Sequence, residues 1–210
     1  MGYLYTAIGD SLTTGFGALP GNGFVPVYRR MAENRLRQQI TVNNLGVNGL
    51  TSGALLERIG HPVYRQALQQ AQLITISIGG NDLIQAAKAV RREPKREAEI
   101  FRSSLAACIN HFDRIIRSIG SLKAGFASPY IVRVVGLYNP YPQIQEASSW
   151  VTRFNRQAGG YSSLSYGFAD VYGLFYGHEK SLLSFDGIHP NGRGYRKIAE
   201  RLNSLGYGLL

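Results

Sequence analysis

A chain of 210 residues, 44% of them hydrophobic, is large enough to bury a core, so we expect a single ordered domain over residues 1–210. Its one cysteine, Cys108, excludes an internal disulfide and a multi-cysteine metal site, and its apolar neighbours indicate a small buried side chain. Lysine and arginine outnumber aspartate and glutamate by 23 to 13, and the formal charge of +10 attracts anionic surfaces without defining a fold.

The first predicted strand covers residues 3–8 and stops at the turn Gly9-Asp10-Ser11. In open α/β sheets, ligands bind beyond the carboxyl ends of the strands, so the hydroxyl of Ser11 would face a binding crevice. Taken alone, this serine is better explained as the cap of the helix that follows. The rest of the chain must therefore decide between the two interpretations.

Strands and helices alternate along the remaining sequence. Further strands are expected at residues 40–42, 73–78, 131–137 and 168–172, each followed by a polar or glycine-containing turn. Helices are expected at residues 25–37, 51–59, 62–71, 82–90, around 150–154, and at 195–205. A long helix is expected to begin at residue 94, with an apolar stripe that reaches residue 119. This alternation predicts an α/β fold, a doubly wound parallel sheet covered by helices on both faces.

Three predicted strand ends carry polar groups that would meet at one edge of a parallel sheet. They are Asp10 and Ser11, then Gly46 and Asn48, then Asn81 and Asp82. A carbonyl oxygen that becomes negatively charged during a reaction requires preset hydrogen-bond donors. The backbone N–H groups of Ser11 and Gly46 and the side-chain amide of Asn81 are such donors, although each is singly explained by a turn or a cap.

An activated serine requires a base within hydrogen-bond reach, usually a histidine that a third group orients. His189 has a carboxylate three residues earlier, Asp186, in a turn that contains glycine and proline. Asp186 can hold one ring nitrogen and leave the other free for Ser11. By itself this spacing is weak, and a helix cap or a polar loop explains it as well. We expect the other three histidines to be structural or solvent-facing: His61, His111 and His178.

Four short blocks, taken in order, resemble those of the GDSL, or SGNH, hydrolases: Gly9-Asp10-Ser11-Leu12, Gly46 after Asn44-Leu45, Gly79-Gly80-Asn81-Asp82, and Asp186-Gly187-Ile188-His189. The resemblance implies a flavodoxin-like three-layer α/β/α fold with a five-stranded parallel sheet. It also implies Ser11 as nucleophile, His189 as base and Asp186 as its orienting group. The implied oxyanion donors are Ser11, Gly46 and Asn81. The chain looks most like small bacterial esterases and lipases of this family, including the type associated with spore germination.

Other functional classes fit the residues less well. The glycines after the first strand do not have the G-x-G-x-x-G spacing of a dinucleotide site, and no acidic residue follows at the required distance. Asp186 and His189 alone are too few ligands for a zinc site. The Gly-x-Ser-x-Gly elbow of α/β-hydrolases is also missing around Ser11. We therefore expect neither a metal ion nor a cofactor.

The sequence thus predicts a serine esterase or lipase that hydrolyses acyl esters through an acyl-enzyme, with lipid or phospholipid esters as the expected substrates. Two alternatives stay open: a carbohydrate acetylesterase on the same fold, and a non-catalytic protein that binds anionic surfaces. Apolar residues that could line a groove for the acyl chain are Phe16, Leu19, Phe24, Leu50 and residues 138–141.

The charge favours transient contact with an anionic membrane surface. No apolar run is long enough to span a bilayer, and the N-terminus lacks a basic segment followed by an apolar core. We therefore expect a cytoplasmic or spore-associated protein. No helix-turn-helix or RNA-binding signature is present, so no nucleic-acid partner is expected. The sequence does not predict the oligomeric state.

Overall fold

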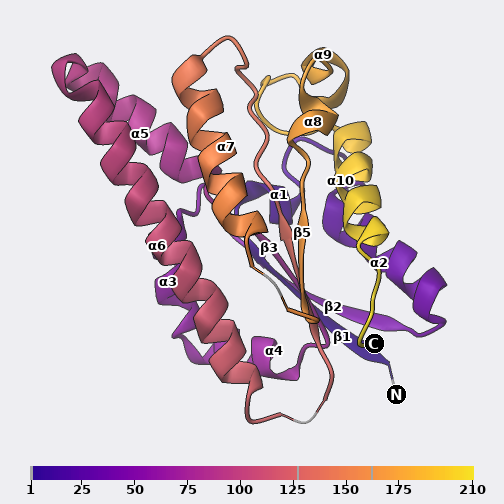
Figure 1. Cartoon of the computed structure of the whole chain (residues 1–210). Helices are drawn as coiled ribbons and strands as arrows, with labels where there is room; N and C mark the ends of the chain where they lie inside the picture. Colours follow the sequence, from indigo (N-terminus) through magenta and orange to yellow (C-terminus); the bar gives the residue numbers. More distant parts are fainter. Residues whose placement is uncertain (1, 127, 162) are drawn as a thin grey trace.

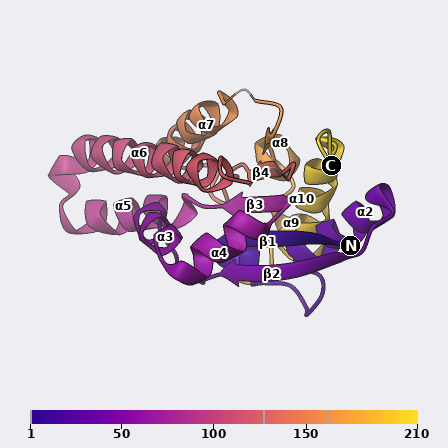
Figure 2. The same ribbon diagram turned by 90° about the horizontal axis from the view of Figure 1, so that it is seen from below.

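The computed structural model of the chain describes residues 2–126, 128–161 and 163–210. Its five strands are all parallel and form one sheet in the order β2-β1-β3-β4-β5, and the first four can be followed in the view from below (Figure 2). The strands are β1 (Tyr3–Gly9), β2 (Ile40–Gly46), β3 (Leu73–Ser77), β4 (Ile131–Val135) and β5 (Tyr166–Ala169). This is the strand order of flavodoxin-like folds, as predicted.

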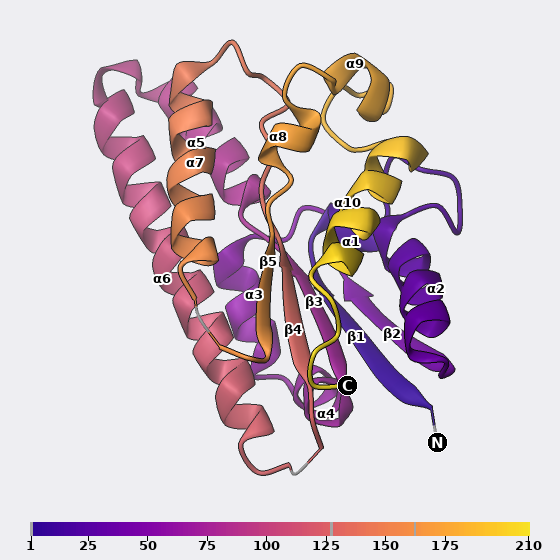
Figure 3. The same cartoon turned by 45° about the vertical axis from the view of Figure 1, so that its right-hand side comes forward.

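Helices cover both faces of the sheet (Figures 1 and 3). On one face lie α3 (Ser52–Ile59), α4 (Pro62–Gln70), α6 (Glu97–Lys123) and α7 (Gln145–Gly159). On the other face lie α2 (Phe24–Leu36) and α10 (Gly192–Ser204). The remaining elements are α1 (Ser11–Thr14), α5 (Gly80–Arg92), η1 (Pro94–Arg96), α8 (Tyr172–Phe175) and α9 (Glu179–Leu182). None of the helices described here has both the length and the apolar character needed to cross a bilayer.

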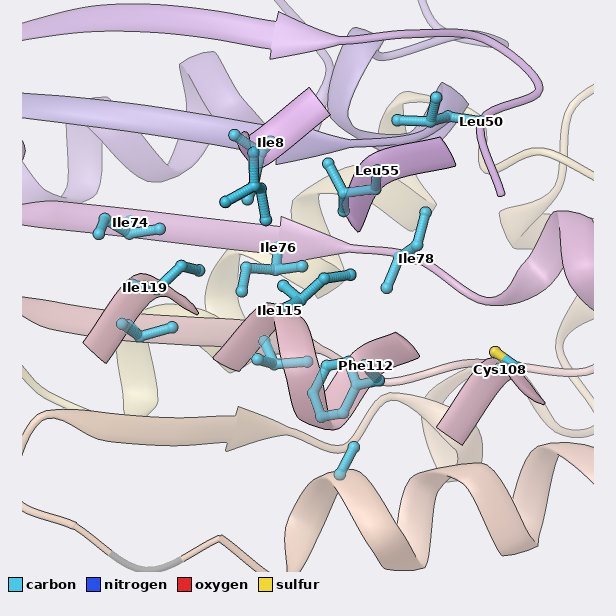
Figure 4. Close-up of a cluster of buried hydrophobic side chains, with 14 of the residues drawn as sticks. Ile8, Leu50, Leu55, Ile74, Ile76, Ile78, Cys108, Phe112, Ile115 and Ile119 are labelled. Atoms are coloured by element: carbon cyan, nitrogen blue, oxygen red, sulfur yellow. The ribbon is translucent and has the colours of Figure 1, made fainter. Parts of the chain in front are cut away.

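The central strand β3 shows why both faces are covered, because all five of its residues are buried. Ile74 and Ile76 point into the cluster with α3 and α6, which Figure 4 shows in close-up. Leu73 belongs to the opposite cluster with α2 and α10. Cys108 is fully buried on α6 within the first cluster, in agreement with the prediction from its neighbours.

Element boundaries differ from the predictions mainly at the edge strands. β2 continues to Gly46, although Asn43 and Asn44 predicted a turn, because this edge strand is largely exposed and tolerates polar residues. The other edge strand, β5, begins earlier and ends earlier than the predicted residues 168–172. Helix α10 begins at Gly192 rather than residue 195, because Asn191 caps it by accepting hydrogen bonds from Arg193 N and Gly194 N.

Candidate active site

The turn after β1 places Ser11 at the first position of α1, at the carboxyl edge of the sheet. Asp10, not Ser11, caps this helix: its Oδ1 accepts a hydrogen bond from Leu12 N at 3.0 Å. Ser77 Oγ, at the end of β3, donates to the same oxygen at 2.8 Å. Burial raises the pKa of Asp10 to about 6, and these hydrogen bonds offset part of that rise. The Ser11 hydroxyl is therefore free of a capping role.

The hydroxyl of Ser11 meets the imidazole of His189 across 178 residues of chain. Ser11 Oγ lies 2.9 Å from His189 Nε2, and His189 Nδ1 lies 2.6 Å from Asp186 Oδ2. A nucleophile, a base and an orienting carboxylate within hydrogen-bond reach are the arrangement that activates a serine. The structure thus brings together the three residues that the sequence singled out.

Asp186 is held in place by more than the histidine. Its other oxygen, Oδ1, accepts hydrogen bonds from Ser184 Oγ at 2.8 Å and from the backbone N–H groups of Ile188 and His189, each at 2.9 Å. Burial by itself would raise the pKa of Asp186, but these donors and the imidazole outweigh it and hold the pKa well below its usual range. The carboxylate therefore stays ionised and can stabilise an imidazolium.

Phe16 packs against the imidazole ring of His189. Its ring centroid lies 4.7 Å from that of His189 in an edge-to-face arrangement with an interplanar angle of 62°. The carbonyl of Phe16 in turn accepts a hydrogen bond of 2.6 Å from Tyr195 Oη, on the buried face of α10. Tyr195 was predicted only as a helical residue, because a link between residues so distant in sequence has no local pattern.

Asn81 lies at the start of α5, after the turn that follows β3. It does not cap the helix, whose cap position is Gly79, so the alternative explanation of this asparagine as an Asx cap is wrong. Its Nδ2 donates to Leu50 O at 3.0 Å, and Asn81 lines the same cavity as Ser11 and His189. The second hydrogen on Nδ2 can therefore serve a ligand in that cavity.

The amide of Gly46 is already used within the protein. It donates to Asn44 Oδ1 at 3.0 Å, while Asn44 Nδ2 donates to Thr13 O. By contrast, Gly49 N has no acceptor within the described parts of the chain, and Gly49 has a φ of +78° in the loop that contacts Asn81 through Leu50. Sequence reasoning missed Gly49, although the Asn48-Gly49 pair is a recognisable turn signal.

An apolar cavity of about 320 Å³ opens beside the Ser11–His189 pair. It runs between α5, the first turns of α6 and α7, and the segment that follows β4. Its wall includes residues 138–141, as the sequence predicted. The other predicted groove residues do not line it: Phe24 and Leu50 are buried in the core, and Phe16 and Leu19 lie outside the lining. Most of its lining is aliphatic or aromatic: Leu12, Leu83, Ile84, Ala87, Phe101, Leu137, Pro140, Ile144, Ala147, Val151 and Ile188.

Comparison with known proteins agrees with this geometry. Residues 7–197 match the model of the GDSL-like lipase/acylhydrolase family. The chain belongs to this family. It is a serine hydrolase of the esterase and lipase type, as predicted. The GDSL-like family match covers all the residues of the Ser11–His189–Asp186 site.

Two relatives of similar length support the assignment to the GDSL-like family. The spore germination lipase LipC of Bacillus licheniformis is 35% identical over 98% of this chain and 97% of its own. The crystal structure of the lipase Lip_vut3, from a goat rumen metagenome, superposes with a TM-score of 0.91 at 34% identity, with 98% of each chain covered. An acetylxylan esterase from Geobacillus stearothermophilus, Axe2, has a TM-score of 0.68 at 19% identity over 98% and 94%, which shows the fold alone.

A partly buried polar network behind the GDSL-like site was not predicted. Ser52 Oγ donates to Asp82 Oδ1 at 2.6 Å and lies 3.1 Å from His111 Nδ1, and Ser52 N donates to Asp82 Oδ2. Burial raises the pKa of Asp82, and the two bonds from Ser52 partly offset it. Because Asp82 follows Asn81 directly, the network ties the start of α5 to α3 and α6. His111 takes part in this network, and its structural role stays a prediction.

Proposed function

We propose that the protein hydrolyses carboxylic esters through an acyl-enzyme formed on Ser11. His189 takes the proton of the Ser11 hydroxyl as its oxygen attacks the ester carbonyl, and Asp186 stabilises the imidazolium. The imidazolium then protonates the leaving alcohol. Water, deprotonated by His189, attacks the acyl-enzyme and releases the acid and free Ser11. The observation that carries the proposal is the Ser11–His189–Asp186 chain of hydrogen bonds at 2.9 and 2.6 Å.

In this proposal the oxyanion is held by Ser11 N and Asn81 Nδ2, with a third donor from the loop after β2. Ser11 N has no acceptor among the residues that the structure describes, as expected for a donor reserved for substrate. The sequence resemblance implied Gly46 as this third donor, but the Gly46 amide donates to the side chain of Asn44. The unoccupied amide of Gly49 is better suited, because its loop contacts Asn81.

We further propose that the acyl part of the substrate is a medium-length or long aliphatic chain that occupies the apolar cavity. Helix α5 lines this cavity from Asn81 to Arg91, and ten residues of helix rise about 15 Å. An extended chain advances about 1.25 Å per carbon–carbon bond, because each bond of about 1.5 Å is inclined to the chain axis, so roughly twelve carbons span that length. Between Asn81 and Lys88 the residues of α5 that line the cavity are apolar, which favours lipid esters over the acetyl groups of a carbohydrate.

Phosphate-bearing lipids are the proposed natural substrates. Lys88 and Arg91 lie on the rim of the cavity, and neither forms an ion pair with a carboxylate in the described ranges. Together with the formal charge of +10, they favour an anionic lipid. Equal rates on neutral and anionic lipid vesicles at low salt would contradict this part of the proposal.

The deciding experiment combines a chain-length series with trapping of the intermediate. Purified protein is given p-nitrophenyl esters from acetyl to hexadecanoyl, and we expect kcat/KM to peak at medium chains. Ser11→Ala should fold normally and lose nearly all turnover. Acid quenching during turnover, followed by peptide mass spectrometry, should locate the acyl group on Ser11. A well-folded protein without turnover on any ester would favour the non-catalytic alternative, and release of acetate from acetylated sugars alone would favour the acetylesterase.

The similarity to LipC also motivates a proposal about location. LipC is by name a spore germination lipase. If this chain acts in the same setting, it should be found with the spore fraction when the source cells sporulate. Immunoblots of separated spores and vegetative cells would test this, and signal only in vegetative cytoplasm would contradict it.

A further inference from the structure

Several large apolar side chains that are exposed to solvent lie in segments that contribute to the active site or its cavity. Phe185 is 99% exposed and directly precedes Asp186, while Leu19 is 75% exposed in the loop between α1 and α2. Phe16, on the His189 ring, is 46% exposed. Tyr141 and Ile144 are also exposed and line the cavity itself. We define these five residues as the apolar rim.

Phe185 is held outward by a defined turn. Leu183 and Pro190 form an antiparallel bridge, and Ser184 N donates to His189 O at 2.7 Å. Gly187 N also donates to Ser184 O, so residues 184–189 form a closed turn between α9 and α10, at the carboxyl edge of the sheet (Figure 1). The phenyl ring at its tip packs against nothing. Such exposure of an aromatic ring is unfavourable in water and points to a surface that is covered during function.

Four positively charged side chains lie in the cavity lining or in a hollow formed by segments next to the apolar rim. Lys88 and Arg91 lie on one side of the cavity, and Arg193 and Arg196 line a neighbouring hollow beside Asn191. None of these four cations pairs with a carboxylate of the described chain. Two acidic residues of this region are engaged, because Asp186 holds His189 and Glu179 accepts from Gly177 N. Glu146, two residues from Ile144, is exposed and forms no ion pair within the described chain, so the four cations outnumber the free carboxylates. Apolar groups flanked by unpaired cations are complementary to an anionic lipid surface.

We propose that the apolar rim is an interfacial docking surface, which inserts Phe185 and Leu19 into an anionic lipid layer and holds the cavity mouth against it. This inference deepens the proposed function by assigning the surface that would deliver lipid esters to Ser11. An acyl chain could then pass from the lipid layer to the cavity without crossing bulk water. Short soluble esters do not need the docking step, so they should be hydrolysed independently of Phe185 and Leu19.

Vesicle binding tests the docking surface separately from hydrolysis. The Ser11→Ala protein and its Phe185→Ser and Leu19→Ser derivatives are sedimented with vesicles of phosphatidylcholine alone or mixed with phosphatidylglycerol. We expect Ser11→Ala to bind mixed vesicles more tightly than neutral ones, and less tightly in high salt. Each serine substitution should weaken binding to mixed vesicles about tenfold. Since binding needs no turnover, its outcome does not depend on the ester hydrolysis proposal.

Leu164 provides the matched control. It is 85% exposed but lies just before β5, at the opposite edge of the sheet, so Leu164→Ser should bind vesicles like its parent. In proteins that retain Ser11, Phe185→Ser and Leu19→Ser should keep kcat/KM on p-nitrophenyl butyrate within about twofold and lose activity on lipid vesicles. Thermal unfolding would verify that these exposed substitutions leave the fold intact.

Three results would overturn the assignment. The first is unchanged vesicle binding in both rim variants, and the second is equal weakening by Leu164→Ser. The third is dimerisation, in which a second copy of the chain covers the apolar rim in place of lipid. Sedimentation velocity that shows a dimer abolished by Phe185→Ser would assign the rim to self-association instead of lipid. A monomer at all concentrations would leave lipid as the occupant.

Discussion

Gly17 and His189 are packed so closely that no side chain fits between them. A Cβ on Gly17 would lie 3.0 Å from His189 Cβ and 2.8 Å from the carbonyl oxygen of Pro190. The loop after α1 therefore packs directly against His189, the partner of the Ser11 hydroxyl at the start of the same helix. This contact leads to the first prediction.

Gly17→Ala should displace His189 and lower kcat by about 10² or more, since a misplacement of about 1 Å can cost that much. Gly21→Ala is the matched control, because Gly21 also has a positive φ, +81°, but an added Cβ there meets nothing within 4 Å. Both substitutions carry a similar backbone strain, so only the steric displacement differs. Steady-state kinetics on a soluble ester would decide, and equal kcat values in the two variants would contradict the positioning role.

Asn81→Ala should lower kcat by about 10² to 10³ with little change in KM, because it removes the donor that we propose for the oxyanion. Gln85→Ala, one turn further along α5 and outside the cavity lining, should behave like the parent protein. The measurement is a full Michaelis curve with p-nitrophenyl butyrate. If kcat stays unchanged in Asn81→Ala, Asn81 does not belong to the oxyanion site.

Ala87→Phe should shorten the preferred acyl chain, because Ala87 lines the middle of the cavity and a phenyl ring there would block it. We expect kcat/KM to fall about tenfold or more for decanoyl esters and to stay within about twofold for acetyl esters. Ala89→Phe, on the same helix but outside the cavity lining, is the control. A uniform loss over all chain lengths would argue that acyl chains bind elsewhere.

Asp10→Asn should change how stability depends on pH. Burial raises the pKa of Asp10 from 3.8 to about 6, so the folded protein holds this proton more tightly than the unfolded chain. The neutral carboxyl therefore contributes its full share to the free energy of unfolding below about pH 4. This contribution is lost as the pH rises through 6, which lowers the free energy of unfolding by about 3 kcal/mol at most.

Urea unfolding at pH 4 and pH 8 would measure this dependence in the wild type, in Asp10→Asn and in a control, Asp170→Asn, at an exposed position after β5. The asparagine keeps an oxygen for Leu12 N and Ser77 Oγ, so its free energy of unfolding should fall less between the two pH values than that of the wild type. Parallel pH profiles in Asp10→Asn and the wild type would contradict the raised pKa.

Much of this structure follows from patterns in the sequence, and the exceptions have physical causes. The buried strand at residues 73–77 and the apolar stripe from Phe101 to Ile119 are local periodicities, so they were predicted well. Edge strands are exposed on one side, so the polar residues of β2 gave a false signal of a turn. The GDSL-like motifs correctly indicated Ser11, Asp186 and His189 as neighbours.

Contacts that depend on tertiary packing could not be predicted. Whether the Gly46 amide is free depends on the rotamer of Asn44, and Ser52, which hydrogen-bonds both Asp82 and His111, joins three separate helices. The exposure of Phe185 depends on a turn closed by Leu183 and Pro190. Each of these relationships joins side chains and backbone that no spacing rule connects.

The burial of Cys108 has a practical consequence for studying this molecule. The only native thiol is inaccessible, and burial raises its pKa, so it should not react with maleimide dyes under native conditions. A Phe185→Cys substitution would therefore carry a single environment-sensitive fluorophore at the tip of the turn beside Asp186. Its emission would report in real time when that tip leaves water for an oily phase.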